Sequence, residues 1–275
     1  MTADFSALDR PDVLMFLFHP RRDYSMPLGT SPAAETKLPG VQDLLVPIED
    51  GIFVGVRFHL CGLPQANILF FHGNGEIAAD YDEIGPFYNR IGINFLAADY
   101  RGYGRSTGHP TVAAMMRDGH TIFQFVTGWL AQNGFTGPLI IMGRSLGSAP
   151  AIELAATHAE QVSGLVIESG FAHAGPLLQL LGVDPAAIGF REETAFRQLD
   201  KIAQFQKPLL IIHAEFDHII PFSDGQALFD ASPAAEKTLL KIPGANHNDI
   251  LAHGFADYLA TIQRFTSICL THRKS

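Results

Sequence analysis

The sequence contains few of the residues that mark secreted, nucleic-acid-binding or disordered proteins. Cysteine occurs only twice in 275 residues, at Cys61 and Cys269. This provides neither a disulfide framework nor a zinc-binding spacing and suggests a reducing, cytoplasmic location. Charged residues make up 17% of the chain and the net charge is -9. A nucleic-acid surface needs clustered Lys and Arg, so we expect no nucleic-acid partner.

Long apolar runs are also missing. The run near the N-terminus covers only Val13 to Phe18, which is too short to span a bilayer and is not organised as a signal peptide. We therefore expect no integral membrane span, while peripheral membrane contact through this run stays open. The sequence gives no indication of the oligomeric state.

The pattern that is present consists of short apolar runs separated by helix-length segments. The runs are "NILFFHG" (67–73), "INFLAADY" (93–100), "PLIIMG" (138–143), "VSGLVIES" (162–169), "PLLIIHAEFD" (208–217) and "TLLKIPG" (238–244). Strands that are apolar on both faces and alternate with helices predict an α/β fold with a mostly parallel, doubly wound sheet. Two further runs around Asp50-Gly51 predict an antiparallel hairpin ahead of it.

The segment boundaries predict a single domain over residues 1–275. Residues 1–40 show no sustained periodicity and are interpreted as an irregular N-terminal strap. The interval 171–206 is longer than one crossover helix requires and is predicted to be a small helical cap insertion. Within it, "EETAFRQLDKIAQF" (192–205) predicts a helix.

Gly143-Arg144-Ser145-Leu146-Gly147 matches G-x-S-x-G at the end of one predicted strand and the start of a predicted helix. In a nucleophile elbow, small neighbours allow a strained turn that lifts the serine hydroxyl above the sheet. Ser145 is therefore a candidate nucleophile. The alternative is a tight strand-to-helix turn that happens to contain serine.

A nucleophilic serine needs a base, and the base needs a group that orients it. His247 follows the last predicted strand, and Asp217 follows the strand before it. The order Ser145, Asp217, His247 is the order of an α/β-hydrolase, and all three follow parallel strands, where open sheets carry their sites. Glu168, after an earlier strand, is the alternative acid.

The loop after the first parallel strand, "FFHGNGE", is expected to supply part of an oxyanion hole. We assign the two donors to the backbone amides of Asn74 and Leu146, the residue after the nucleophile. His72 is expected to support this loop structurally. Arg144 is expected to form a salt bridge inside the protein, and Asp249 to cap or orient the loop of His247.

Taken together, the motifs resemble those of the α/β-hydrolases, specifically the small-capped serine hydrolases of the Bem46-like group. The resemblance rests on "FLFHP", "FFHGNGE", "DYRGYGRSTG", "GRSLG", "FDHIIPF" and "GANHNDI", which occur in family order from Phe16 to about Leu251. It implies a serine hydrolase that needs no cofactor and acts on small-molecule esters, thioesters or related acyl compounds. The N-terminal membrane segment of many relatives is not found in this sequence.

The acyl site is expected to be apolar and to lie beneath the cap. The candidate substrate-binding residues are Phe171, Leu177, Leu181 and Phe222. The alternative is that these side chains form the core of the cap instead.

Other functions compete for the same residues. Gly73, Gly75, Ala78 and Asp99 also fit the pattern of a dinucleotide-binding oxidoreductase. A metal site could use His213, Asp217, His218, His247, Asp249 or His253, but none repeats the H-E-x-x-H spacing, and we expect no metal. A serine peptidase and a catalytically inactive binding protein on the same fold are further alternatives.

Overall fold

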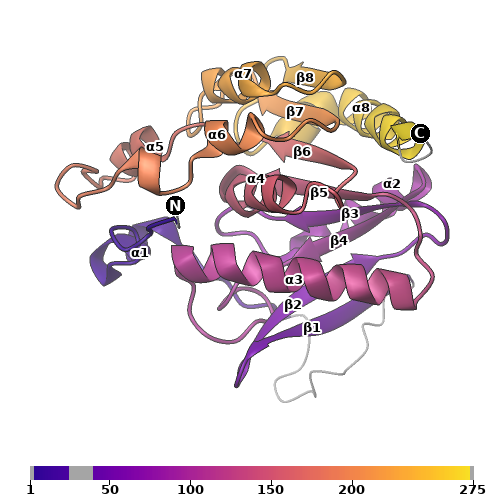
Figure 1. Ribbon diagram of the computed structural model, residues 1–275, viewed down its shortest axis with the longest axis horizontal. Helices are drawn as coiled ribbons and strands as arrows, with labels where there is room; N and C mark the ends of the chain where they lie inside the picture. Colours follow the sequence, from indigo (N-terminus) through magenta and orange to yellow (C-terminus); the bar gives the residue numbers. More distant parts are fainter. Residues whose placement is uncertain (1–2, 25–39, 273–275) are drawn as a thin grey trace.

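Eight strands form one sheet in the order β1-β2-β4-β3-β5-β6-β7-β8 in a computed structural model of the chain, which describes residues 3–24 and 40–272 (Figure 1). The strands are β1 (Val41–Glu49), β2 (Ile52–His59), β3 (Ala66–Phe71), β4 (Ile93–Ala98), β5 (Leu139–Arg144), β6 (Gly164–Glu168), β7 (Leu209–Ala214) and β8 (Lys237–Ile242). From β4 to β8 in this order all pairs are parallel, while β2 is antiparallel to both β1 and β4. The predicted fold class and the N-terminal hairpin are confirmed.

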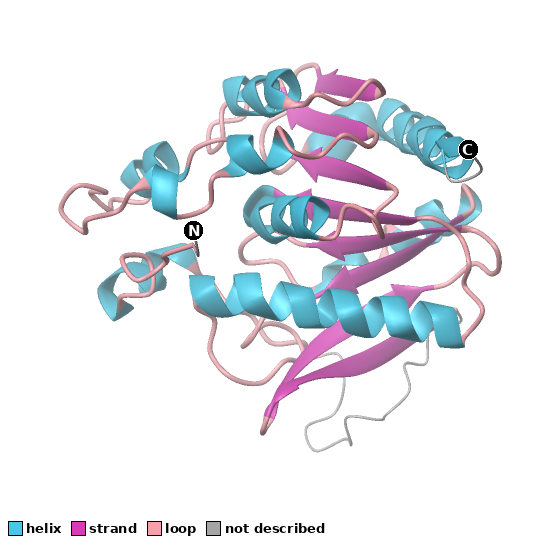
Figure 2. Cartoon of the chain, in the orientation of Figure 1, coloured by secondary structure: helices cyan, strands magenta, loops and turns pink. Residues whose placement is uncertain are grey.

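Helices cover both faces of the sheet (Figure 2). They are α1 (Pro11–Leu17), α2 (Gly85–Arg90), α3 (Val112–Gln132), α4 (Ser148–Thr157), α5 (Ala174–Leu180), α6 (Gln198–Ile202), α7 (Phe222–Ala231) and α8 (Ile250–His272), with 3-10 helices η1 (Ala78–Asp82), η2 (Ser145–Gly147) and η3 (Glu192–Thr194). Helices α3, α4, α6 and α7 lie on one face, and α2 and α8 on the other. No helix among the described residues is long and apolar enough to cross a membrane.

Alternation along each central strand builds two cores. Leu69 and Phe71 of β3 pack into the cluster beneath α3 and α4, while Ile68 and Phe70 pack into the cluster beneath α2 and α8. All four side chains are buried, because successive strand residues point to opposite faces of a sheet that is covered on both sides. Because the strands from β4 to β8 are parallel, their carboxyl ends lie at one edge of the sheet, where a site can form.

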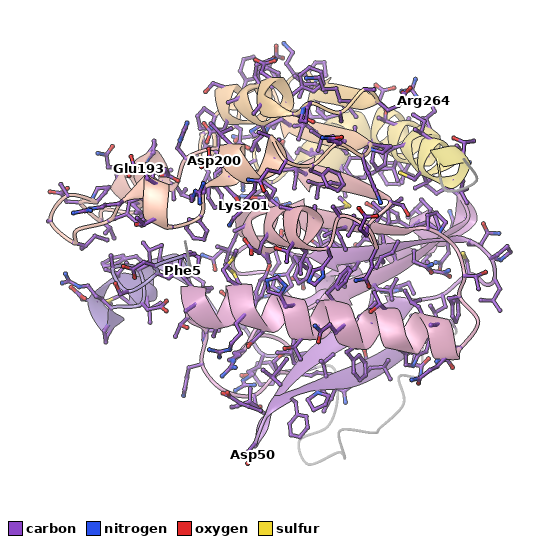
Figure 3. The ribbon with its side chains drawn as sticks, in the orientation of Figure 1. Phe5, Asp50, Glu193, Asp200, Lys201 and Arg264 are labelled. Atoms are coloured by element: carbon purple, nitrogen blue, oxygen red, sulfur yellow. The ribbon has the colours of Figure 1, made fainter. Side chains whose placement is uncertain are left out.

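The region predicted as a cap contains α5, η3 and α6. Helix α5 lies beyond the carboxyl ends of the central strands, whereas α6 packs between α4 and α7 in the layer that covers one face of the sheet (Figure 3). The single helix predicted over 192–205 is wrong. Arg197 adopts a left-handed backbone conformation with φ of 52°, which interrupts the helix between η3 and α6. Just before this break, the ring of Phe196 is buried and packs against Phe5 and Phe171, so tertiary packing overrides helix propensity here.

The N-terminal strap is less irregular than predicted. Residues 1–2 and 25–39 lie outside the described residues, but Pro11–Leu17 forms helix α1, with Pro11 in its first turn. Phe5 contacts the cap through Phe196, at a ring-centroid distance of 5.3 Å. The beginning of the chain thus lies beside the cap, at the edge of the sheet where the parallel strands end.

Candidate active site

Ser145 occupies the turn between β5 and α4 with a φ of 51°. A Cβ added to Gly143 would lie 2.2 Å from the carbonyl oxygen of Gly147, and one added to Gly147 would lie 2.1 Å from that of Phe71. Because both clashes involve backbone, the two glycines are required for the strand and helix to approach this closely. The predicted elbow geometry is present.

The structure brings the three predicted catalytic residues together. Nδ1 of His247 lies 2.7 Å from Oδ2 of Asp217, and Nε2 lies 3.0 Å from Oγ of Ser145. An ionised carboxylate only accepts hydrogen bonds, so Nδ1 carries the proton and donates it to Asp217. Nε2 is then free to accept the proton of the serine hydroxyl. All three side chains are buried.

Asp217 is held in its charged form. Burial alone would raise its pKa, but the hydrogen bond from His247 and those from the backbone amides of Ile219 and Ile220 outweigh burial and lower the pKa. His213 lies behind it, with Nε2 donating to the carbonyl oxygen of Ile220. Burial lowers the pKa of His213, which favours the neutral imidazole beside this carboxylate.

The loop after β3 is fixed by hydrogen bonds from distant segments. The Asn74 side-chain oxygen accepts from the backbone amide of His19 and from the Tyr103 hydroxyl, and its amide nitrogen donates to Nδ1 of His19. His72 donates from Nδ1 to the carbonyl oxygen of Gly73. Leu146 directly follows Ser145 in η2. The assignment of the backbone amides of Asn74 and Leu146 as oxyanion donors stays a prediction.

Glu168, the alternative acid, is engaged elsewhere. Its carboxylate accepts hydrogen bonds from Arg144 Nε at 3.1 Å and from the Tyr258 hydroxyl at 2.7 Å. Burial raises the pKa of Glu168. It is Asp217 that contacts His247, so the geometry favours Asp217 over Glu168 as the orienting acid.

The proposed substrate-binding residues have mixed positions. Phe171 is 2% exposed and packs edge-on against Phe196. This position fits the alternative in which Phe171 forms part of the core of the cap. The ring of Phe222 packs against His213 of β7. Leu177, in the middle of α5, and Leu181, which follows its last residue, are half-buried. Phe171 and Phe222 therefore have packing roles in this structure, and an acyl-binding role for Leu177 and Leu181 remains a prediction.

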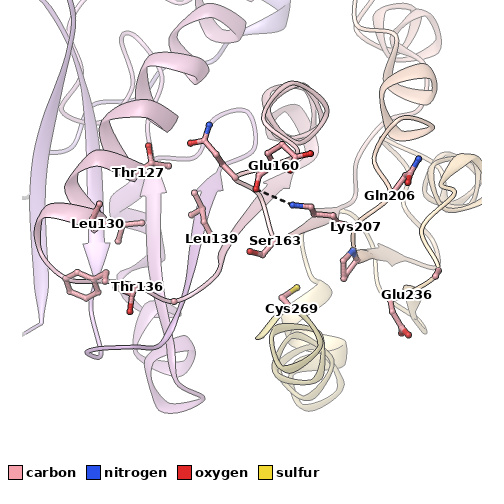
Figure 4. Close-up of a pocket in the computed structure, with 16 residues that line it drawn as sticks. Thr127, Leu130, Thr136, Leu139, Glu160, Ser163, Gln206, Lys207, Glu236 and Cys269 are labelled. Atoms are coloured by element: carbon pink, nitrogen blue, oxygen red, sulfur yellow. Dashed lines mark hydrogen bonds between the residues drawn. The ribbon is translucent and has the colours of Figure 1, made fainter. Parts of the chain in front are cut away.

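Ser145 itself lines neither of the two sizeable cavities. One of about 540 Å³ is lined by residues just before strands, among them Ser163, Lys207 and Glu236, and by helix residues that include Cys269 of α8 (Figure 4). It opens at the amino ends of the parallel strands, opposite the edge that carries Ser145. Another, of about 470 Å³, lies between η1, α2 and α8, and its lining includes Arg144 and Asn248, the neighbours of Ser145 and His247 in the sequence. The chemistry of the Ser145 edge, rather than cavity size, identifies the candidate site.

The alternative sites are not supported. The loop at Gly73 and Gly75 leads into the five-residue η1 and not into a crossover helix whose N-terminus could bind a pyrophosphate. Asp99, expected to bind a ribose, is buried and accepts from the amide of Ala78. Among residues 3–24 and 40–272, no group of three or more His, Cys, Asp or Glu side chains is arranged to hold a metal ion.

The sequence is similar to several curated proteins. The 17C alpha/beta hydrolase domain-containing protein of Xenopus laevis is 32% identical over 229 residues, covering 80% of this chain and 67% of that protein. The human 17B protein is 33% identical over 212 residues, covering 73% and 66%. The chain belongs to the α/β-hydrolase family. It spans about two thirds of the length of these curated relatives, and the Bem46-like assignment within the family stays a resemblance.

A family model described as "Serine aminopeptidase, S33" also matches this α/β-hydrolase, at residues 62–187. Among solved structures, an esterase of Pyrococcus furiosus superposes with a TM-score of 0.66 at 17% identity, covering 92% of this chain and 98% of the esterase. A monoglyceride lipase of Saccharomyces cerevisiae gives a TM-score of 0.64 at 19% identity, covering 89% and 98%. At these identities the superpositions establish the shared fold.

Proposed function

We propose that this hydrolase cleaves an ester or thioester bond of a small or acyl-chain substrate through an acyl-enzyme formed on Ser145. The observation that supports this most directly is the continuous chain of hydrogen bonds from Ser145 through His247 to Asp217. A serine hydroxyl is a weak nucleophile by itself, and a base within 3 Å that is oriented by a carboxylate is what activates it.

In the first half of the reaction, Oγ of Ser145 attacks the acyl carbon while Nε2 of His247 takes its proton. Asp217 stabilises the imidazolium that forms and holds its tautomer. The same proton then passes to the leaving alcohol or thiol as the carbonyl bond reforms. In the second half, His247 deprotonates a water molecule, which attacks the acyl-enzyme and releases the acid.

The negative charge on the acyl oxygen requires donors at the same edge of the sheet. We assign them to the backbone amides of Asn74 and Leu146. The hydrogen bonds that hold the Asn74 side chain to His19 and Tyr103 limit the movement of its loop, and preorganised donors of this kind contribute about a hundredfold or more in rate.

The esterase and lipase structural neighbours support ester bonds as the substrate class. The aminopeptidase description of the matching family model favours a second candidate, hydrolysis of a short peptide at the same serine. Both reactions would use the same triad, so the two candidates differ in the leaving group and not in the nucleophile.

Fluorophosphonate labelling of the wild type and of Ser145→Ala, with the labelled peptide located by mass spectrometry, tests the assignment. Labelling at Ser145 that the variant abolishes is the expected result. Labelling at another residue, or none in folded protein, would refute the nucleophile. A panel of p-nitrophenyl esters, acyl thioesters and aminoacyl anilides then separates the esterase from the peptidase.

A further inference from the structure

Arg144, the residue before the candidate nucleophile, makes contacts with three separate segments of the active site. Nη2 donates to the backbone carbonyl oxygen of His247 at 2.8 Å and to the side-chain oxygen of Asn248 at 3.1 Å. Nη1 donates to the carboxylate of Glu76, and Nε donates to Glu168. The Arg144 side chain is only 11% exposed, so it acts inside the protein.

Glu76 extends this contact to the loop after β3. One of its oxygens accepts from Arg144, and the other accepts from the backbone amide of Gly73 at 2.7 Å and from the Tyr81 hydroxyl at 2.8 Å. A Cβ added to Gly73 would lie 2.7 Å from Nη1 of Arg144 and 2.9 Å from Oε2 of Glu76. The ion pair therefore fills the space that a side chain at position 73 would need.

Glu168 holds the guanidinium group of Arg144 at its Nε atom. Arg144 and Glu168 are paired in register at the ends of β5 and β6. The second oxygen of Glu168 accepts from Tyr258 of α8, whose hydroxyl also lies 2.9 Å from that of Tyr88. Burial opposes the charge on Arg144, but the two carboxylates outweigh it and raise its pKa. Arg144 is thus a fixed cation with a planar, two-sided set of donors.

We propose that Arg144 is a positioning residue that aligns the His247 loop and the oxyanion loop with Ser145. The proposal rests on the proposed serine-hydrolase function and extends it. One guanidinium reaches His247 directly and reaches Gly73, next to Asn74, through Glu76. Since it also precedes Ser145 in the chain, a single side chain sets the relative position of nucleophile, base and oxyanion donors. A displacement of about 1 Å between such groups can cost about a hundredfold in rate.

The test compares Arg144→Lys with Arg57→Lys. Arg57 is a matched control, because it is also buried and is bound by Asp43 and Asp82, on the hairpin side of the sheet. Both substitutions keep the charge and remove the planar fork. We expect Arg144→Lys to lower kcat for p-nitrophenyl butyrate by about 10- to 100-fold with KM changed less than about threefold. Arg57→Lys should leave kcat within about twofold, although it also lowers Tm.

Glu76→Gln tests the branch of the network that runs from Arg144 to Gly73 through Glu76. The substitution keeps the size of the side chain and removes its charge. It should lower kcat on its own. Combined with Arg144→Lys, it should cost little more than the worse of the two single changes, because residues of one network are not additive.

Hydrogen exchange of the backbone supplies a readout that is independent of activity. Peptides containing Gly73 and those containing His247 and Asn248 should exchange faster in Arg144→Lys and be unchanged in Arg57→Lys. Equal losses of kcat in the two lysine variants, or unchanged exchange at both loops, would overturn the positioning role. If the wild type neither hydrolyses the ester nor labels with fluorophosphonate, the proposed function fails, and exchange alone decides whether Arg144 holds the two loops.

Discussion

Nε2 of His247 lies 3.0 Å from Oγ of Ser145, although 102 positions separate the two residues in the sequence. This contact predicts the effect of removing the hydroxyl. Ser145→Ala should lower kcat by about 10⁴-fold or more, because the nucleophile is lost while substrate binding is kept. Steady-state kinetics on an activated ester measure the effect, and near-normal activity would rule out Ser145 as the nucleophile.

The backbone of Ser145 makes a separate prediction about stability. Its φ of 51° lies in the left-handed region, where a side chain is strained and glycine is not. Ser145→Gly and Ser145→Ala both lack the hydroxyl, so they differ mainly in the Cβ. Glycine should be more stable than alanine here by about 1 kcal/mol, measured by urea denaturation. Equal stability would mean that the elbow stores little backbone strain.

The two candidate acids can be distinguished by isosteric amides. Asp217→Asn should lower kcat by about 10³- to 10⁴-fold, because the amide no longer fixes the tautomer or stabilises the imidazolium. Glu168→Gln should have a milder effect on kcat, because Glu168 contacts Arg144 and Tyr258 rather than His247. A mild effect at Asp217 together with a severe one at Glu168 would reverse the assignment.

Substitution by alanine should change the stability of the protein in opposite directions at Gly147 and at Gly128. Gly147→Ala places a Cβ 2.1 Å from the carbonyl oxygen of Phe71, whereas a Cβ at Gly128 in α3 meets nothing within 4 Å. Gly147→Ala should therefore destabilise strongly or prevent folding, and Gly128→Ala should stabilise by about 0.5–1 kcal/mol through helix propensity. Thermal unfolding measures the Tm of both variants. An unchanged Tm for Gly147→Ala would contradict the close approach of strand and helix.

The contact between α4 and the cap helix α6 should weaken in acid. Glu153 is close to His120 and forms an ion pair with Lys201 of α6 at 2.5 Å. The nearby His120 and the ion pair with Lys201 outweigh burial and lower the pKa of Glu153 from 4.5 to about 2. A carboxylate with a depressed pKa contributes stability above its unfolded value, here 4.5, and loses it as the pH falls towards about 2.

Comparing Glu153→Gln with wild type measures this contribution. The substitution should lower Tm by about 2–5 °C at neutral pH, and the difference should shrink steadily below about pH 4.5. Glu160→Gln, in the exposed turn after α4, serves as the control and should not change Tm. A Tm difference that is the same at neutral and acid pH would show that the ion pair does not carry the effect.

The sheet and the three residues of the candidate triad could be predicted because their signals are local. Buried strands leave continuous apolar runs, and Ser145, Asp217 and His247 each follow such a run within a few positions. Because these strands are parallel, their carboxyl ends lie at one edge of the sheet. No knowledge of distant contacts was needed for this part of the site.

What the sequence did not reveal depends on contacts between distant segments. The left-handed turn at Arg197 follows from the packing of Phe196 against Phe5, nearly two hundred positions earlier. The hydrogen bond from His19 to Asn74 likewise joins segments that are far apart in the sequence. Arg144 was correctly expected to form a salt bridge, but its bond to the His247 carbonyl depends on how three loops meet, and no local pattern encodes that.

The order of these segments along the chain has a consequence for synthesis. The anchor of Asn74, at His19, leaves the ribosome early, whereas the base of Ser145 follows the serine by 102 residues. Chains emerge at about 5–20 residues per second, N-terminus first. For at least several seconds, therefore, each nascent chain carries Ser145 without the imidazole proposed to activate it, and the proposed hydrolysis requires that β8 and the loop after it have first joined the sheet.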